Sequence, residues 1–139
     1  MKLEVVTDAN GIPLGTTIAA ANRSETDLLE IAIDAIDDIP VKLPDKIPLV
    51  ADRGYDCDPL RDRLAEQGIE LISPHRKNRT KPPRNAGRKM RRYARRYKIE
   101  RTNAWLHNFR RIANRWERYS FTYHGFVRLT CIVIAVGQL

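Results

Sequence analysis

Two apolar stretches joined by a polar turn open the chain. They predict strands over Leu3–Thr7 and Ile12–Ala20, and the Asn-Gly pair between them is a strong short-range hairpin signal. Ser24 is a candidate N-cap with Asp27 three residues later, and apolar residues then recur at helical spacing. This pattern predicts a helix over residues 25–37.

Further short apolar runs follow a loop predicted over Pro40–Pro48. Ile47–Ala51 ends abruptly in an Asp-Arg-Gly segment, which predicts a buried strand that delivers a carboxylate at its end. The next helix begins at Asp58, which can cap it, and ends before Gly68. Ile69–Ile72 is predicted as another short strand.

The segment 73–92 separates this part from the C-terminal helices. It carries nine Lys/Arg, no Asp or Glu and almost no large apolar residue, so we expect a mobile basic loop. A helix is predicted over Arg91–Ile112 and a last apolar helix over residues 125–136. An apolar stripe should pack inward, and it consists of Trp105, Phe109, Ile112 and Trp116.

The predicted order β-β-α-β-α-β-loop-α-α indicates one α/β domain over residues 1–139. Charge is unevenly distributed: residues 1–70 carry 7 Lys/Arg against 15 Asp/Glu, and residues 71–139 carry 18 against 2. A basic half of this kind suits a polyanion such as DNA. Cys57 and Cys131 lack metal-ligand spacing and indicate a reducing compartment, and no apolar run is long enough to span a membrane.

Glu100 is an isolated carboxylate in the most basic stretch of the chain. On a helix it shares one face with Tyr93, Arg96, Asn103 and His107, because steps of three, four and seven residues return to nearly the same angle. By position alone, Glu100 would be an ion-pair partner and Asp52 a turn or cap residue. Trp105, Phe109 and Trp116 are interpreted as core residues and not as stacking platforms, and His75 and His124 as solvated or core residues that are not metal ligands.

Three stretches together resemble a known family: IPLVADRGYD, RYARRYKIERTNAWLHNFRRI and the opening VVTDANGIPLGTTIAAANRSE. They resemble bacterial insertion-sequence transposases with an RNase H-like DDE catalytic domain. In that family the second catalytic aspartate stands in a D-[RG]-[GA]-Y-D stretch, which corresponds to Asp52. The third carboxylate is the glutamate of a Y-x2-R-x3-E-x6-[KR] signature, which Tyr93, Arg96 and Glu100 match. His107 departs from its last position, where Arg110 or Arg111 could substitute.

The resemblance implies a mixed sheet flanked by helices, and Asp52 and Glu100 as catalytic carboxylates that hold Mg²⁺ or Mn²⁺. Two such ions would support cutting of insertion-sequence ends and strand transfer to double-stranded target DNA. Tyr93, Arg96, His107, Arg110 and Arg111 would contact DNA, as would four residues of the basic loop: Arg76, Lys77, Arg79 and Lys81. A homo-oligomer on DNA in the bacterial cytoplasm, associated with the nucleoid and with no membrane partner, is expected.

Asp8 could complete a triad with Asp52 and Glu100, but we interpret it as a turn residue of the hairpin. In RNase H-like domains the first aspartate lies on the strand before this hairpin. We therefore expect an N-terminally truncated domain, to which an upstream reading-frame product would supply the first strand. Alone, the chain should be inactive and either poorly stable or self-associating, because its strand edges are unpaired.

A second hypothesis comes from a different functional class. The chain would be a non-catalytic basic remnant that binds element ends or regulates transposition without cutting DNA. The two hypotheses differ in whether the carboxyl groups of Asp52 and Glu100 reach a shared metal.

Overall fold

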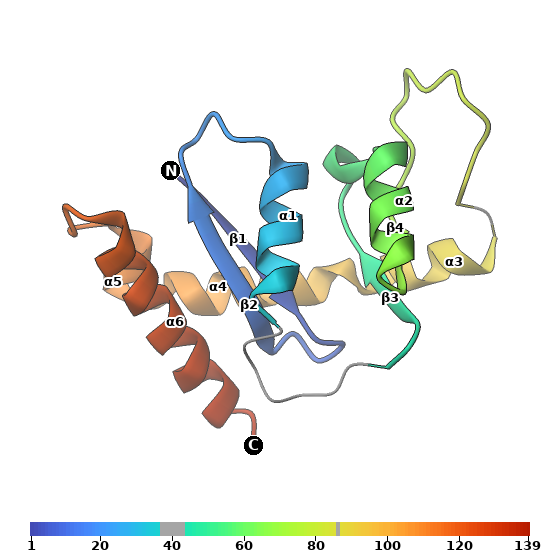
Figure 1. The fold of residues 1–139 in the computed structure, drawn as a ribbon. Coiled ribbons are helices and arrows are strands. Elements are labelled where there is room, and N and C mark those ends of the chain that lie inside the picture. The colour runs from blue at the N-terminus through green and yellow to red at the C-terminus, as the bar shows by residue number, and fades with distance from the viewer. Residues whose placement is uncertain (37–43, 86) are drawn as a thin grey trace. The chain divides into compact units, whose positions relative to one another are not determined.

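The computed structural model describes residues 1–36, 44–85 and 87–139, which belong to two compact units. Unit 1 comprises Met1–Pro40 and Lys98–Leu139, and unit 2 comprises Val41–Tyr97. Figure 1 labels the elements, and each unit is described by itself. The described strands form one antiparallel and one parallel two-stranded sheet accompanied by helices, so the predicted α/β class is confirmed. The RNase H-like sheet stays a prediction.

Unit 1 begins with the predicted hairpin. Strands β1 (Lys2–Thr7) and β2 (Pro13–Ala19) pair antiparallel, with a register shift between Val6 and Thr7. In the turn, the Asp8 amide donates to the Ile12 carbonyl at 2.9 Å, and Gly11 adopts a φ of 83°. A positive φ favours glycine, which explains why the Asn-Gly pair signals this turn.

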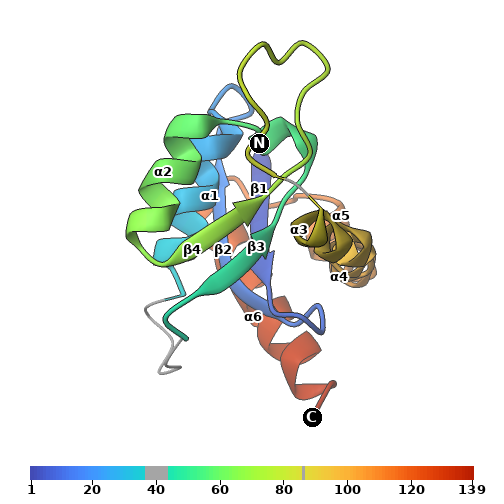
Figure 2. The ribbon, with the colours of Figure 1, turned by 90° about the vertical axis from the view of Figure 1, so that its right-hand side faces the viewer.

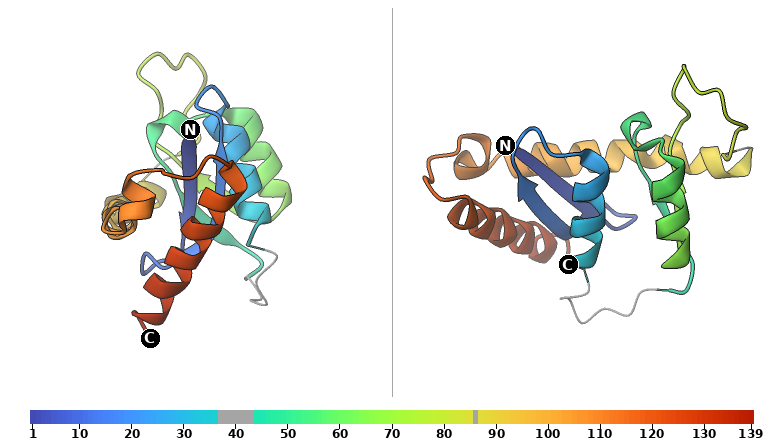
Figure 3. Two further views of the ribbon diagram at one scale, coloured as in Figure 1. Left: turned by 90° about the vertical axis from the view of Figure 1, so that its left-hand side faces the viewer. Right: turned by 45° about the horizontal axis from the view of Figure 1, so that its top comes forward.

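Helices cover both faces of the hairpin. Helix α1 (Glu25–Asp34) packs on one face, and helix α6 (Ser120–Val136) packs on the other (Figure 3). Successive β2 residues point to opposite faces, so Gly15 meets α1 while Thr16 bonds His124 of α6 at 3.0 Å. The core under α6 is formed by Leu106, Ile112, Tyr123, Val127 and Ile134, with Leu3, Val5 and Ile18 packed against it.

Gly15 permits the close approach of α1 to the hairpin. A Cβ at this position would lie 2.2 Å from the Ala32 carbonyl oxygen, a backbone atom that cannot move without shifting the helix. We expect Gly15→Ala to lower the free energy of unfolding by about 2–3 kcal/mol. Gly125→Ala is the control, because nothing lies within 4 Å of its added Cβ and alanine favours the helix interior by up to about 1 kcal/mol. Urea denaturation of both variants should give opposite signs; equal midpoints would contradict this packing.

Unit 2 is built on a β-α-β crossover. Strands β3 (Ile47–Val50) and β4 (Ile69–Ile72) pair in parallel, and α2 (Asp58–Glu66) connects them and packs against β4 (Figure 2). Leu60 and Leu64 of α2 are fully buried. Because the strands are parallel, their carboxyl ends meet at one edge, which is where the short 3₁₀ helix η1 (Arg53–Tyr55) begins.

The predicted loop over residues 73–92 is wrong at its C-terminal end. Helix α3 (Arg88–Arg91) already occupies it, since Arg, Lys and Met are good helix formers, and the 3₁₀ helix η2 (Arg92–Arg96) follows where an α-helix was predicted. The single helix predicted over Arg91–Ile112 is also interrupted. Helix α4 (Tyr97–His107) ends before Phe109, whose extended backbone starts a separate turn, α5 (Arg110–Ala113). The break lets Ile112 join the core beneath α6.

Other boundaries moved by several residues. Helix α1 ends at Asp34, whereas the prediction extended to residue 37. Residue 37 and the first part of the loop predicted over Pro40–Pro48 lie outside the described residues. Helix α6 begins at Ser120 rather than residue 125. Trp116 was predicted to lie in the core and is 79% exposed, because it follows α5 in an irregular connection where the helical stripe no longer applies.

Candidate active site

Asp52 lies directly beyond the carboxyl end of β3, as predicted. Its Oδ1 accepts a hydrogen bond from the Gly54 amide at 2.6 Å, so it caps η1, and its side chain is 57% exposed. Its backbone carbonyl accepts from the Ser73 hydroxyl at 2.5 Å, which ties it to the end of β4. One carboxylate oxygen is thus held by the turn while the group stays open to solvent. The cap role is shown, and the catalytic role stays a prediction.

Two residues of the predicted signature lie beside Asp52 within unit 2. The Arg96 guanidinium Nη1 is 3.9 Å from Asp52 Oδ2, and its Cζ is 5.7 Å from the centroid of the Tyr93 ring. Both residues belong to η2, which contacts β3. The unit therefore presents a carboxylate, a guanidinium and an aromatic ring together, a set that suits a phosphate next to a metal-binding oxygen.

Glu100 is exposed on α4, in unit 1. The helix is fixed to the hairpin turn by three donors: Lys98 Nζ bonds the Ala9 carbonyl, Arg101 Nη2 the Asn10 carbonyl at 2.5 Å, and buried Thr102 Oγ1 the Gly11 carbonyl at 2.5 Å. This anchoring orients the turn of α4 that carries Glu100. Asp52 and Glu100 belong to different units, so their sharing of a metal stays a prediction.

Asp8 has the geometry of a turn residue. Its Oδ1 accepts hydrogen bonds from the amides of Asn10 and Ile12, each at 2.8 Å, which closes the hairpin connection. These bonds account for an aspartate at this position without catalysis. In the part of the chain that the structure describes, no three His, Cys, Asp or Glu side chains are grouped so as to hold a metal ion.

The last signature position and its predicted substitutes lie in unit 1. His107 Nδ1 is 2.7 Å from the Asn103 carbonyl oxygen within the same helix. Both Arg110 and Arg111 are exposed, but Arg111 pairs with Glu117 at 2.7 Å and lies over the Phe126 ring at 5.0 Å. Arg110 is therefore the better placed of the two arginines for a phosphate.

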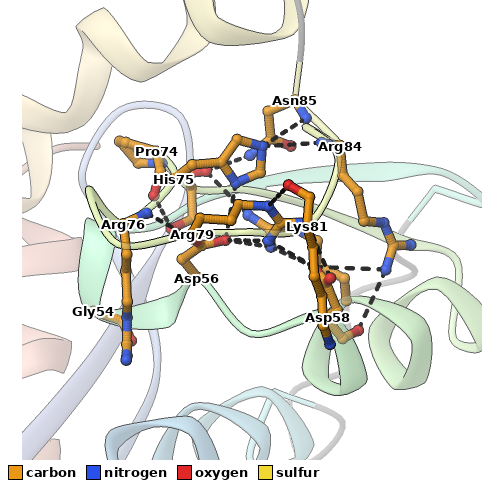
Figure 4. Close-up of polar contacts among 12 residues, drawn as sticks. Gly54, Asp56, Asp58, Pro74, His75, Arg76, Arg79, Lys81, Arg84 and Asn85 are labelled. Carbon is orange, nitrogen blue, oxygen red and sulfur yellow. Dashed lines mark hydrogen bonds and ion pairs between the residues drawn. The ribbon is translucent and has the colours of Figure 1, made fainter.

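A buried ion cluster in unit 2, which the sequence reasoning missed, centres on Asp56. The Asp56 side chain is only 3% exposed and accepts from Arg61 Nη1 at 2.6 Å, from the Arg76 amide at 2.7 Å and from Arg79 Nη1 at 3.3 Å. His75 Nδ1 also lies 3.0 Å from it (Figure 4). Burial alone would raise the pKa of Asp56, but the Arg76 amide and the Arg61 and His75 side chains hold it well below its usual range.

Asp58 binds the same basic segment a second time. The Arg79 guanidinium donates two parallel hydrogen bonds to its carboxylate, from Nη1 to Oδ1 at 3.1 Å and from Nη2 to Oδ2 at 3.0 Å. These hydrogen bonds lower the pKa of Asp58. Arg84 pairs with exposed Asp62 at 2.8 Å, and its amide donates to His75 Nε2 at 2.9 Å. The segment after β4 is therefore anchored by ion pairs and hydrogen bonds, whereas the sequence predicted a mobile loop.

This anchoring divides the four basic-loop residues predicted to bind DNA. Arg79 is bound to Asp58, and Arg76 bonds the Gly54 carbonyl through its guanidinium at 2.7 Å. Lys77 and Lys81 are exposed. A phosphate would meet the two lysines first, because contact with Arg79 would require breaking its bidentate pair. The signal for this cluster is present in the sequence as the acids Asp56, Asp58 and Asp62 that precede the basic run.

Comparison with known proteins places the chain in a family. Residues 1–134 match the family model described as a transposase DDE domain, and the chain belongs to this family. It is 37% identical over 144 residues to a Burkholderia cepacia protein named "Putative transposase for insertion sequence element IS402". That alignment covers 99% of this chain and 64% of the relative. No solved structure matches the chain. None of the helices in the described ranges is both long and apolar enough to cross a membrane.

Proposed function

We propose that this chain contributes the catalytic centre of a DNA transposase that cuts insertion-sequence ends and joins the freed strands to target DNA. In this proposal residues 1–139 form one RNase H-like catalytic domain that acts as a homo-oligomer on DNA, in the bacterial cytoplasm at the nucleoid. The supporting observation is the exposed Asp52 carboxylate at the carboxyl end of β3, 3.9 Å from Arg96. Membership of the transposase DDE domain family supports the reaction class.

Each residue has a role in this proposal. Asp52 and Glu100 hold Mg²⁺ or Mn²⁺ through carboxylate oxygens, which are the ligands that hard cations prefer. Asp52 fits this role because its side chain is more than half exposed and only its Oδ1 is bound by the η1 turn. Bound metal would activate the attacking hydroxyl and stabilise the leaving oxygen. Arg96, backed by the Tyr93 ring, positions the phosphate that is attacked.

A further carboxylate is supplied, in this proposal, by a segment outside these 139 residues. Asp8 is a poor candidate for it, because its carboxylate is bonded to the amides of its own turn. The chain alone should therefore leave DNA uncut, because it lacks one carboxylate. It should also self-associate, because its strand edges are unpaired. Joining it to an upstream segment that carries a strand with an aspartate should restore a monodisperse, active protein. Light scattering and a nicking assay would compare the two forms; cutting by the chain alone that Asp8→Asn abolishes would reassign the first carboxylate to Asp8.

DNA binding itself should depend on exposed lysines of the anchored segment. We expect the double variant Lys77→Ala/Lys81→Ala to weaken duplex binding at all sequences and to reduce the slope of log affinity against log salt by about two, since each lost phosphate contact removes about 0.9. Fluorescence anisotropy between low and physiological salt measures the slope. The control is Lys89→Ala, because Lys89 is already paired with Glu70. Equal slopes for parent and double variant would exclude these lysines from the DNA surface.

The alternative function is binding of element ends without cutting. It requires the exposed lysines Lys77 and Lys81 for contact with DNA, and no metal shared by Asp52 and Glu100. The two proposed functions are distinguished with the chain joined to that upstream segment, which we call the extended chain. It is incubated with Mg²⁺ and a supercoiled plasmid that carries an element end. Nicked plasmid supports the transposase proposal, and tight binding without nicking supports the remnant.

A further inference from the structure

Three large aromatic rings are exposed in the connection after α5 and in the first turn of α6. Trp116 is 79%, Tyr119 59% and Phe121 74% exposed, and they lie within six residues of each other. Burying a large apolar side chain stabilises a fold by about 1.5–3 kcal/mol, so three such rings on the surface of one short segment call for an explanation. We name this feature the aromatic surface: Trp116, Arg118, Tyr119 and Phe121.

The rings of the aromatic surface are already arranged for stacking. Tyr119 and Phe121 have centroids 5.6 Å apart and planes inclined by 22°, so they form a stacked pair. The Arg118 Cζ lies 5.9 Å from the centroid of the Tyr119 ring. Stacked rings with a nearby guanidinium are the elements by which proteins bind bases of single strands, because every base has a flat π-face.

The connection is held in shape by Arg115. Its Nε donates to the Glu117 carbonyl at 3.0 Å, and its Nη2 donates to the Arg118 carbonyl at 3.2 Å. Arg115 and Ser120 also line a shallow hollow together with Ile18 and Ala20 of unit 1. The aromatic surface therefore sits on a braced backbone beside a recess, and binding would require little ordering of the loop.

The charge around these rings is positive. Arg110, Arg111, Arg115 and Arg118 lie in the same stretch, and its acid, Glu117, has a side chain only 5% exposed. The hydrogen bond from Arg111 at 2.7 Å lowers the pKa of Glu117, and the Trp116 amide adds a second bond at 3.2 Å. Glu117 is thus turned inward and paired with Arg111, which leaves the exposed Arg110 and Arg118 to face a negatively charged partner.

We propose that the aromatic surface binds unpaired bases of single-stranded DNA, with its rings stacking on bases and its arginines on the flanking phosphates. The inference rests on the proposed function in that DNA is the substrate, and it adds a second contact outside the Asp52 and Glu100 site. DNA ends produced by strand cutting have terminal bases that can unpair. Arginines interleaved with aromatic residues complement the phosphates and bases of such a strand. They complement an uncharged surface of a partner protein less well.

Binding of labelled oligo(dT) and of a duplex of equal length by the full 139-residue chain tests this inference. We expect Trp116→Ala, and Tyr119→Ala with Phe121→Ala, to weaken oligo(dT) binding about tenfold or more while duplex affinity changes less than about twofold. Trp116→Tyr keeps a ring and should stay close to the parent. Leu129→Ala is the control, because Leu129 is an exposed apolar residue of α6 outside the aromatic surface. Oligo(dT) should also quench Trp116 fluorescence, and Trp116→Phe should remove that quenching.

Several outcomes would overturn the inference. The first is that the parent does not bind oligo(dT), and the second is that the ring variants lose affinity equally for oligo(dT) and for duplex. The third is that the main effect of the ring variants is a change in self-association, measured by light scattering, which would assign the surface to a second copy of the chain. The proposed function fails separately, through absent nicking by the extended chain. If the extended chain does not nick DNA but the ring variants still weaken oligo(dT) binding, the proposal for the aromatic surface is still supported.

Discussion

Asp56→Ala should lower the free energy of unfolding of unit 2 by about 3–5 kcal/mol. The carboxylate is the main partner of Arg61, whose side chain is 5% exposed, and its removal leaves a buried guanidinium without its closest counter-charge. It also removes the acceptor for the Arg76 amide and for His75, so the segment after β4 loses part of its attachment, while the Arg79–Asp58 pair remains. Urea denaturation monitored by circular dichroism measures the loss.

Asp62→Ala is the matched control for this result. Asp62 also pairs with an arginine of the basic segment, Arg84 at 2.8 Å, but both side chains are exposed. Exposed ion pairs contribute about 0–1 kcal/mol, so this variant should stay close to the parent. Similar midpoints for Asp56→Ala and Asp62→Ala would show that the buried cluster does not hold the segment.

The cluster also predicts how stability depends on pH. The folded-state pKa of Asp56 and that of Asp58 are both lowered, so these carboxylates stabilise the fold fully above the unfolded value of about 4. The contribution is lost as pH falls below about 4 through the folded values. The Asp56→Ala variant, compared with the parent, should therefore lose less stability between pH 5 and pH 3 as measured by the same denaturation experiment.

Glu100→Gln and Asp52→Asn should each reduce metal-dependent nicking by the extended chain to the uncatalysed level. Each amide keeps the shape of its carboxylate but loses the charge that binds a divalent cation. Duplex affinity should change by less than about threefold, because Glu100 and Asp52 are exposed acids and the phosphate contacts come from lysine and arginine. Plasmid nicking with Mg²⁺ and with Mn²⁺ measures the loss of cutting, and fluorescence anisotropy measures duplex affinity.

Glu70→Gln serves as the control for these two variants. Glu70 is a carboxylate of β4 that pairs with Lys89, and it has no role in the proposed chemistry. Its amide variant should nick at the parental rate. Parental nicking by Glu100→Gln would remove Glu100 from the site, and the same result for Asp52→Asn would leave Asp52 as a cap of η1 alone.

The sequence predicted well the features that depend on neighbouring residues. The hairpin, the strand end at Asp52 and the strand Ile69–Ile72 follow from short apolar runs bounded by turn residues, and the structure confirms them. The predicted burial of the strand before Asp52 was wrong, because the residues of β3 are half-buried or exposed. Asp8 was interpreted as a turn residue for the same local reason, and its two bonds to backbone amides agree. Such features need no knowledge of what packs against them.

Features that depend on distant contacts were missed. The helical period placed Trp116 on the inward stripe with Ile112, but the chain leaves the helix at Phe109 so that α6 can return over the core. The basic charge was interpreted as a surface for DNA, although Asp56 and Asp58 neutralise part of the basic segment. Opposite charges far apart in sequence can pair in the fold, and composition does not distinguish that pairing from an external partner.

The most direct test of the proposed catalytic centre is a double-mutant cycle on metal affinity. Mn²⁺ binding to the extended chain on element-end DNA would be measured by electron paramagnetic resonance for the parent, Asp52→Asn, Glu100→Gln and the double variant. If both carboxylates hold one ion, each single variant should weaken binding strongly and the double variant should lose little more, because the two losses are coupled. Losses that add in full, or singles that bind Mn²⁺ like the parent, would contradict a metal shared by Asp52 and Glu100.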